Sequence, residues 1–297
     1  MTVTPHDFLA VEFEGHRPRL KAVAYRMLGS LAEAEDAVQE SWLRLARSDA
    51  DEIDNLGGWL TTVVGRVCLD MLRTRKARHE EPMAGRLPDP VVSLEDAADP
   101  EQQALLADSV GLALLVVMDS LSPAERLAFV LHDMFGLPFV QIGLIVNRTP
   151  VAAKKLASRA RQRVRGAVPD ADSDRADQRR VVDAFLAAAR GGDFDGLLAI
   201  LDPDVVLRAD AGVLAGGLKA IRGAAAVAGQ LGTFQRMATL AVTHPALVNG
   251  NAGLVNTIDD ELFSVMSFTV ADGRIAAIDV LSDPGRLNGL DLADPTG

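Results

Sequence analysis

Cysteine and aromatic residues are scarce in this chain. Of its 297 residues only Cys68 is a cysteine, and phenylalanine, tryptophan and tyrosine together make up 4%. A single cysteine excludes a disulfide within the chain and suits a reducing compartment, so we expect a cytoplasmic protein. The N-terminus lacks a charged start followed by an apolar run, and no uncharged apolar stretch is long enough to span a bilayer. We therefore expect neither a signal peptide nor a membrane partner.

Positive charge is also in short supply, but it is concentrated in one place. The chain carries 41 acidic and 30 basic residues, for a formal net charge of −11. The segment from Arg148 to Arg165 nevertheless holds seven arginines and lysines and no acid. A basic cluster within an acidic protein is the electrostatic signature of contact with nucleic-acid phosphates.

The length of the chain and the change in its sequence pattern predict a multidomain protein. A chain of 297 residues is long enough for roughly two domains. Helical periodicity covers the early part and the middle, whereas the C-terminal part alternates a helix with short strand-like runs. We expect a first all-α module at 1–80, an acidic proline-containing linker at 81–108, a second all-α module at 109–168, a short linker at 169–178 and an α+β domain at 179–297.

The first module contains an amphipathic helix with an acidic side. Ser30 and Glu33 have the spacing of a capping box, so we expect the helix to begin there. Its apolar positions, Trp42 among them, recur on one face, and the other face is polar. On spacing alone such a polar face is more often a solvated surface than a binding site. Its members are Glu33, Asp36, Gln39 and Glu40.

The next helix is predicted to start near Trp59, after a pair of glycines, and to end in a basic tail. Its outer side gathers enough cations for phosphate contact to be favoured over simple solubilisation. Trp59 could stack on an unpaired base or pack in the core, and both alternatives stay open. Asn55, in the loop 48–55, is the candidate for holding a flipped base. The cations are Arg66, Arg73, Arg75 and Lys76.

The second module has the pattern of a helix-turn-helix. A second capping box, at Ser122 and Glu125, opens it, and a short apolar helix then ends at a turn around Asn147. Thr149 can cap the next helix and Pro150 suits its first position. Two short helices around a tight turn, the second of them basic, are typical of DNA-binding proteins. Facing the major groove we expect Arg148, Ala152, Lys155 and Arg159, either reading bases or holding phosphates.

The C-terminal domain shows two hairpin signals, Asn249-Gly250 and Asp272-Gly273. They predict a curved antiparallel sheet with helices packed on one face. Asp210, His244 and Asp279 could line a pocket. The sequence of this domain shows no recurring group of chemically active side chains, so we expect no catalytic residue, metal or cofactor.

Three motifs, in this order, carry a resemblance to a known family: AEDAVQESWLRL, WLTTVVGRVCLDMLRTRKAR, and the segment from LSPAERLAF to RQRVR. Together they resemble the extracytoplasmic-function sigma factors of bacteria over nearly all of residues 1–168. The resemblance implies that the polar face around Asp36 binds core RNA polymerase. It also implies that the basic helix near Arg66 captures the minus-ten promoter element and that the helix-turn-helix reads the minus-thirty-five element. The implied activity is promoter-specific transcription initiation.

Residues 175–297 resemble the SnoaL-like cone fold, which one subgroup of these sigma factors carries fused at the C-terminus. The subgroup has a linker motif of Trp-Leu-Pro-Glu-Pro type and a C-terminal motif of Asn-Pro-Asp-Lys-Leu type, both matched here imperfectly; of a third, Asp-Gly-Gly-Gly-Lys, little but the first residue remains. The resemblance implies regulation in cis through Leu87, Pro88, Asp89, Pro90, Asp210, Asp283, Pro284, Arg286 and Leu287.

Two other interpretations of the C-terminal domain stay open. It could be a SnoaL-like isomerase or cyclase, or a sensor of an unknown small ligand, carried in either case on a DNA-binding chain. A pocket lined by paired carboxylates would favour the enzyme. The acidic helix of the first module argues against a simple DNA-binding sensor, which has no need of a second helical module of this type.

Overall fold

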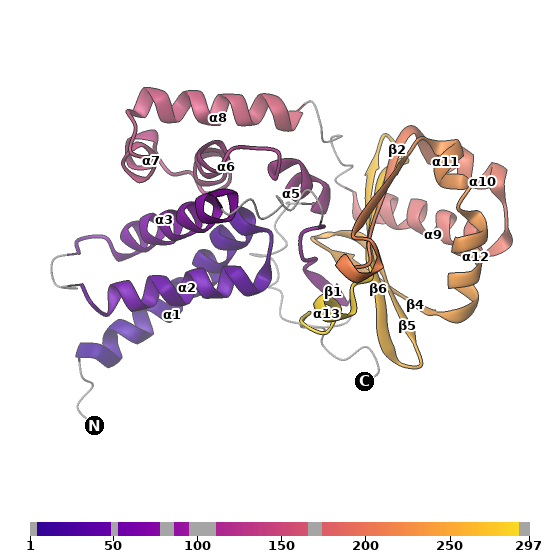
Figure 1. Cartoon of the computed structure of the whole chain (residues 1–297), viewed down its shortest axis with the longest axis horizontal. Helices are drawn as coiled ribbons and strands as arrows, with labels where there is room; N and C mark the ends of the chain where they lie inside the picture. Colours follow the sequence, from indigo (N-terminus) through magenta and orange to yellow (C-terminus); the bar gives the residue numbers. More distant parts are fainter. Residues whose placement is uncertain (1–4, 49–52, 78–85, 95–110, 166–173, 291–297) are drawn as a thin grey trace. The chain divides into compact units, whose positions relative to one another are not determined.

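A computed structural model describes residues 5–48, 53–77, 86–94, 111–165 and 174–290 (Figure 1). The chain divides into two compact units. The first, here called the helical unit, comprises Met1–Pro82 and Val117–Ala167; the second, the cone unit, comprises Met83–Val116 and Val168–Gly297. Much of the segment expected to be a free linker is thus grouped with the cone unit.

The helical unit begins with α1 (Pro5–Leu28), α2 (Leu31–Leu45) and α3 (Leu56–Ala77). Trp42 of α2 packs against Phe13 of α1, with ring centroids 5.1 Å apart. The capping box predicted at the start of α2 is wrong, because the Ser30 side chain makes no cap hydrogen bond. The Glu33 carboxylate is instead paired with Arg75 of α3, which draws it away from the helix start.

The helix-turn-helix forms as predicted. After α5 (Leu112–Met118) come α6 (Pro123–Phe129), a π-helical turn η3 (Val130–Met134), α7 (Phe139–Val146) and α8 (Pro150–Arg165). The capping box of Ser122 and Glu125 is confirmed. Asn147 ends α7 in the left-handed conformation with φ 56°, as a tight turn requires. The Ala152 N–H donates to Thr149 Oγ1 at 3.2 Å, so Thr149 caps α8.

Within the helical unit α6 lies between α3 and α8 (Figure 1). Gly65 of α3 faces the second module at ordinary van der Waals distance. A Cβ atom on Gly65 would lie 3.4 Å from Leu131 Cδ1 and 3.8 Å from Ile145 Cδ1. A polar contact accompanies it: the buried Arg126 pairs with Asp119, and its Nε donates to the Arg26 carbonyl at 3.1 Å.

The cone unit is built on a seven-stranded sheet in the order β1-β4-β5-β6-β7-β2-β3. The strands are β1 (Val92–Leu94), β2 (Leu201–Asp210), β3 (Leu218–Arg222), β4 (Val242–Val248), β5 (Asn251–Ile258), β6 (Glu261–Ala271) and β7 (Arg274–Leu281). The expectation of a purely antiparallel sheet is wrong at one pair, since β2 and β7 run parallel. Parallel neighbours need a long crossover connection, and the chain between β2 and β7 supplies it.

Both predicted hairpins are confirmed. Asn249 and Gly250 join β4 to β5, and Asp272 and Gly273 join β6 to β7. All four residues have positive φ, as a type I′ turn requires. Strand β1 was not predicted: it comes from the segment expected to be a linker and pairs with β4 through Val92 opposite Val248.

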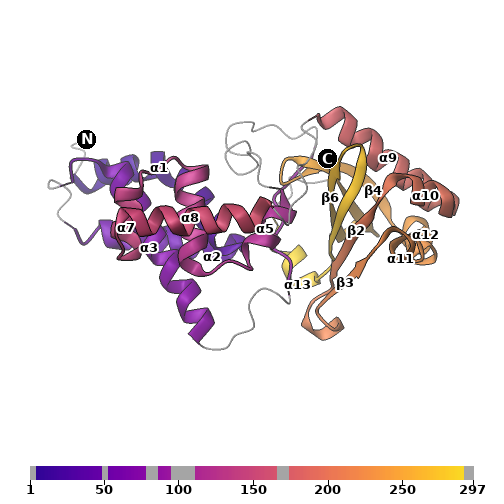
Figure 2. The same ribbon diagram turned by 90° about the horizontal axis from the view of Figure 1, so that it is seen from above.

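Four helices cover one face of the sheet: α9 (Arg175–Gly191), α10 (Phe194–Ile200), α11 (Ala224–Ala228) and α12 (Leu231–Leu240) (Figure 2). Their core centres on Phe185, which packs against Phe234 and Phe268. A short helix η4 (Val213–Ala215) precedes β3. Helices on one face of a curved mixed sheet form the α+β cone that the sequence resemblance implies.

The other face of the sheet carries a second apolar cluster. Leu254 belongs to the helix-covered core, whereas its neighbour Val255 belongs to this second cluster, as alternation along a strand requires. Leu287 of α13 (Pro284–Leu287) is buried in it, and Val92 of β1 packs against it. The linker segment therefore contributes Val92, and the last described helix contributes Leu287, to the sheet face opposite to α9–α12, and α13 lies on that side in Figure 2.

Candidate nucleic-acid and polymerase interfaces

Helix α8 is held to the helical unit by small side chains. Ala153, Ala157 and Ala160 are fully buried, and they allow α8 to lie close to α6. The opposite side of the helix is exposed, Lys155 and Arg159 included. This leaves a basic surface on the solvent side of the helix-turn-helix.

Several of these cations are engaged by acids of their own unit. Arg163 Nη1 lies 2.9 Å from Glu125 Oε2, and Arg159 Nη1 lies 3.9 Å from the other oxygen of that carboxylate. Arg161 Nε donates to Asp133 at 2.6 Å. Burial alone would raise the pKa of Glu125, but hydrogen bonds from Ser122 and the charge of Arg163 hold that pKa below its usual value. Glu125 thus ties α8 to the start of α6.

The predicted groove-facing residues differ in their surroundings. Arg148 and Lys155 are exposed, and among the described residues neither takes part in an ion pair. Arg159 is 63% exposed but lies near Glu125. Ala152 is half-buried. Arg148 and Lys155 are therefore the members of this set most accessible to DNA.

On α3 the predicted phosphate-binding residues separate into two groups. Arg66, Arg73 and Lys76 are exposed, although Arg73 lies 3.6 Å from Asp70 and Arg66 lies 3.5 Å from the Leu144 carbonyl. Arg75 is different, because its side chain is only 17% exposed and is paired with Glu33. Arg75 therefore joins α3 to α2, a structural role that the sequence did not suggest.

Asn55 has a structural role at the start of α3. Its Oδ1 accepts a hydrogen bond from the Gly58 N–H at 2.9 Å, so it caps the helix. The helix consequently begins at Leu56, three positions before the predicted start at Trp59, and both glycines lie in its first turn. Trp59 itself is half-buried. Residues 49–52 of the loop expected to hold a flipped base lie outside the described residues.

The polar face of α2 contains an exposed leucine. Asp36 and Gln39 are exposed, Glu40 bonds to Arg44 at 2.9 Å, and Glu33 is engaged by Arg75. Leu43 is 46% exposed and follows Asp36 by seven positions, so both lie on the same side of the helix. Leu43 was not predicted from the sequence, although its place outside the apolar stripe of the helix could have revealed it.

Arg286 of α13 holds the linker segment on the cone unit. Its Nη1 lies 2.8 Å from Asp210, its Nε donates to Asp89 at 2.9 Å, and its Nη2 donates to the Leu87 carbonyl at 2.6 Å. The Leu87 N–H in turn donates to Asp210 at 2.8 Å. Asp210 and Leu87 are fully buried. We call these four residues the linker clamp.

The remaining residues of the two imperfect motifs surround the clamp. Pro88 and Pro90 are buried. Asp283 caps α13 by accepting from the Gly285 N–H at 3.0 Å, and Pro284 occupies the first turn of that helix. A Cβ atom on Gly212 would lie 2.6 Å from the Asp283 carboxylate, and Gly212 has φ +83°. Gly212 is thus needed next to the cap of α13.

Asp210, His244 and Asp279 each have a polar partner within the cone unit. Asp279 is held by Arg208, whose Nε and Nη2 lie 2.5 and 3.2 Å from its two oxygens. Burial raises the pKa of Asp279, and Arg208 opposes that shift. The His244 ring lies 3.3 Å from Thr257 Oγ1. Each of the two buried carboxylates has its own arginine partner.

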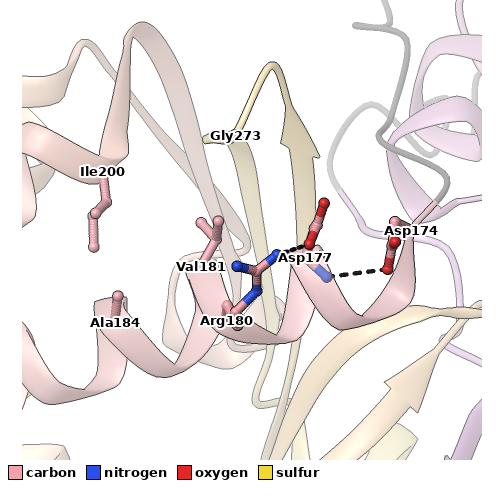
Figure 3. Close-up of a pocket in the computed structure, with 7 residues that line it drawn as sticks. All are labelled: Asp174, Asp177, Arg180, Val181, Ala184, Ile200 and Gly273. Atoms are coloured by element: carbon pink, nitrogen blue, oxygen red, sulfur yellow. Dashed lines mark hydrogen bonds and ion pairs between the residues drawn. The ribbon is translucent and has the colours of Figure 1, made fainter.

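An open hollow of about 550 Å³ lies along α9 on the cone unit (Figure 3). Arg180 of its lining pairs with Asp177, and Asp174 caps the start of α9. None of the three residues predicted to line a pocket borders this hollow. It is lined by Asp174, Asp177, Arg180, Val181, Ala184, Ile200 and Gly273.

Neither a metal site nor a membrane span is found in the described part of the chain. No group of three or more His, Cys, Asp or Glu residues there could hold a metal ion. None of the helices described is long and apolar enough to cross a membrane.

Comparison with known proteins agrees with the order of the modules. The family model for Sigma-70 region 2 matches residues 13–78, and that for Sigma-70 region 4 matches residues 111–164. The chain is 38% identical to the ECF RNA polymerase sigma factor SigJ of Mycobacterium tuberculosis, over 96% of both chains. The chain belongs to the extracytoplasmic-function (ECF) sigma factors.

Further relatives extend this likeness over the cone unit. The sigma factor is 35% identical to the probable ECF RNA polymerase sigma factor SigI of Mycobacterium tuberculosis, over 97% of this chain and 98% of the relative. The crystal structure of SigJ covers 95% of this chain and 99% of its own, with 34% identity and a TM-score of 0.75. The sigma factor therefore shares with SigJ both its helical modules and its C-terminal α+β domain.

Proposed function

We propose that this sigma factor directs core RNA polymerase in the cytoplasm to specific promoters and initiates transcription there. The observation that carries the proposal is the exposed basic side of α8. This helix is the second of the helix-turn-helix, and Thr149 caps its start. In such motifs the second helix lies in the major groove. We assign α8 to the minus-thirty-five element, and Arg66, Arg73 and Lys76 of α3 to the backbone of the minus-ten element.

The polar face of α2 is our candidate for the polymerase contact. Asp36 and Gln39 are exposed, and Leu43 adds an apolar group beside them. An exposed apolar side chain on the same side of the helix as a carboxylate suits a protein partner better than it suits DNA, because phosphates repel the carboxylate. The segment AEDAVQESWLRL, which carries this face, resembles the segment with which the family binds polymerase.

We further propose that the cone unit regulates the sigma factor in cis through the linker clamp. The segment Arg86–Leu94 lies in the chain between α3 and α5, and thus between the two DNA-reading modules. Arg286, Asp210 and β4 hold this segment on the cone unit. A change in the strength of the linker clamp therefore alters the connection between the two DNA-reading modules. Because Asp210 and Asp279 are each paired with an arginine, we favour this role over catalysis.

In vitro transcription with purified core polymerase tests these assignments. The full chain should initiate at a defined set of promoters, whereas a chain truncated after Val168 should retain α3 and α8 but change in output. A truncation at Leu281, which removes Arg286 and opens the clamp, should also change output. A full chain that leaves polymerase initiation unchanged on every template would refute the proposed function. A Leu281 truncation with unchanged output would refute only the regulation.

A further inference from the structure

Four residues form the outermost row of α8. Val151, Lys155, Ser158 and Gln162 are separated by four, three and four positions, so at about 100° per residue they lie within a narrow stripe. This stripe is opposite to the buried Ala153, Ala157 and Ala160. All four members are exposed. From Val151 to Gln162 this central row therefore carries one charge, that of Lys155, within a helix side that is otherwise basic.

Three of the arginines, Arg159, Arg161 and Arg163, lie at the flanks of this stripe, and Arg165 follows it as the last residue of the helix. Arg161 and Arg163 are displaced from it toward the body of the unit, where they contact Asp133 and Glu125. Arg159 is nearer to the stripe but lies 3.9 Å from Glu125. A guanidinium held at the flank of a recognition helix is placed for the groove wall, where the phosphates are. These arginines are thus better placed to position α8 than to read bases.

Val151 is an unexpected residue at this place. It lies in the first turn of a basic helix, yet 67% of its surface is exposed. The N-terminal residues of a recognition helix are the ones that contact base edges. Among groups in the major groove, the 5-methyl of thymine is the one that an apolar side chain contacts favourably. Lys155, one turn later in the same stripe, can donate to guanine O6 and N7.

We propose that Val151 and Lys155 determine the base preference of the minus-thirty-five reader, Val151 by contact with a thymine methyl and Lys155 by contact with a guanine. Arg159, Arg161 and Arg163 position the helix and contact phosphates. The inference rests on the proposed function, since it requires α8 to enter a promoter groove. It names the residues of that helix that give specificity.

The test for Val151 uses holoenzyme reconstituted from the full chain and core polymerase. Its preferred minus-thirty-five element is first selected from a randomised promoter pool, and every thymine of that element is then replaced by uracil, which lacks the methyl. We expect the wild type to lose about fourfold in affinity, the value of one buried methyl-sized group. Val151→Ala should bind the thymine duplex more weakly by a similar factor and be insensitive to uracil.

Val140 gives a matched control. It is 63% exposed on α7, outside the recognition helix, so Val140→Ala should keep the wild-type response to uracil. For Lys155, replacing guanine by 7-deazaguanine removes the N7 acceptor; the wild type should lose affinity and Lys155→Ala should not respond. Arg159→Ala should weaken binding equally on all duplexes and lower the salt dependence.

The outcomes separate this inference from the proposed function. Holoenzyme that selects no sequence from the pool would refute the proposed function. Holoenzyme that selects a sequence, with Val151→Ala selecting the same bases and responding to uracil as the wild type does, would refute the inference alone. A shift of base preference in Arg159→Ala with none in Lys155→Ala would also overturn it.

Discussion

Replacing Arg286 by alanine tests the linker clamp directly. The change removes the contacts from Arg286 to Asp210, Asp89 and the Leu87 carbonyl. Asp210, whose side chain is 0% exposed, then keeps, among the residues that the structure describes, the N–H groups of Leu87 and Gly212. A buried carboxylate that loses its cation is destabilised, because neither water nor another charge replaces the lost partner.

The expected magnitude follows from the burial of both partners. Breaking a buried ion pair from one side costs about 3–5 kcal/mol. Because the Arg286 side chain is 12% exposed and water can enter part of the vacated space, we expect the lower end, about 3 kcal/mol. For a unit of this size that corresponds to a fall in Tm of about 6–12 °C. The loss should appear in the unfolding of the cone unit.

Differential scanning calorimetry measures the shift, and Arg274→Ala supplies the control. Arg274 begins β7 of the same sheet and is exposed, so its removal should change the unfolding free energy by less than about 0.5 kcal/mol. Adding Asp210→Asn to Arg286→Ala should recover part of the loss, because the unpaired charge is gone. Limited proteolysis should cut the Arg286→Ala variant faster within 86–94. Equal Tm values for Arg286→Ala and Arg274→Ala would refute the clamp.

Three further predictions concern the helical unit. Cys68 is fully buried and burial raises its thiol pKa far above the usual value, so the native protein should not react with iodoacetamide at pH 8 until it is unfolded in urea; rapid native labelling would contradict this. The pKa of Glu125 is lowered in the folded state, so its contribution to stability is fully present above the unfolded pKa of about 4.5 and is lost as the pH falls through the lower folded value. The urea midpoint of Glu125→Gln should therefore depend less on pH below about 4.5 than that of the wild type, and parallel curves would count against this. Charge reversal at both Asp36 and Glu40 should abolish co-purification with core polymerase without loss of fold, with Asp70→Lys, on the exposed side of α3, as the control; wild-type recovery of polymerase would make this face merely solvated.

Local chemistry made the helix-turn-helix predictable from sequence. Three local features define it: the capping box at Ser122, the left-handed Asn147 and the cap at Thr149. Each of them involves residues no more than four positions apart in the chain. The same holds for the hairpins at Asn249 and Asp272. Such signals involve one turn of chain and are little affected by distant contacts.

The failures came from long-range pairing. Ser30 and Glu33 have the spacing of a capping box, but Arg75, 42 positions after Glu33, takes the carboxylate. The parallel pairing of β2 with β7 and the addition of β1 at the sheet edge likewise depend on residues far apart in the chain. Periodicity within a window cannot detect such partners. For the same reason Arg75 resembled its exposed neighbours Arg73 and Lys76 until the fold was known.

The linker clamp shows how an imperfect motif can keep its physical role. Only Leu87, Pro88 and Pro90 of the linker motif match the subgroup letter for letter, yet Asp89 offers Arg286 the same kind of oxygen that a glutamate would. Asp210 is the residue that remains of the largely missing third motif. Its carboxylate accepts hydrogen bonds from the Leu87 N–H and from Arg286. What the structure retains is therefore a charge arrangement, a buried acid between a backbone donor and a guanidinium. An arginine at position 286 fits it better than a lysine would, because one planar guanidinium reaches Asp89, Asp210 and the Leu87 carbonyl together. Arg286→Lys should accordingly keep the Asp210 pair, lose the bond to the linker, and raise proteolysis of 86–94 more than it lowers Tm.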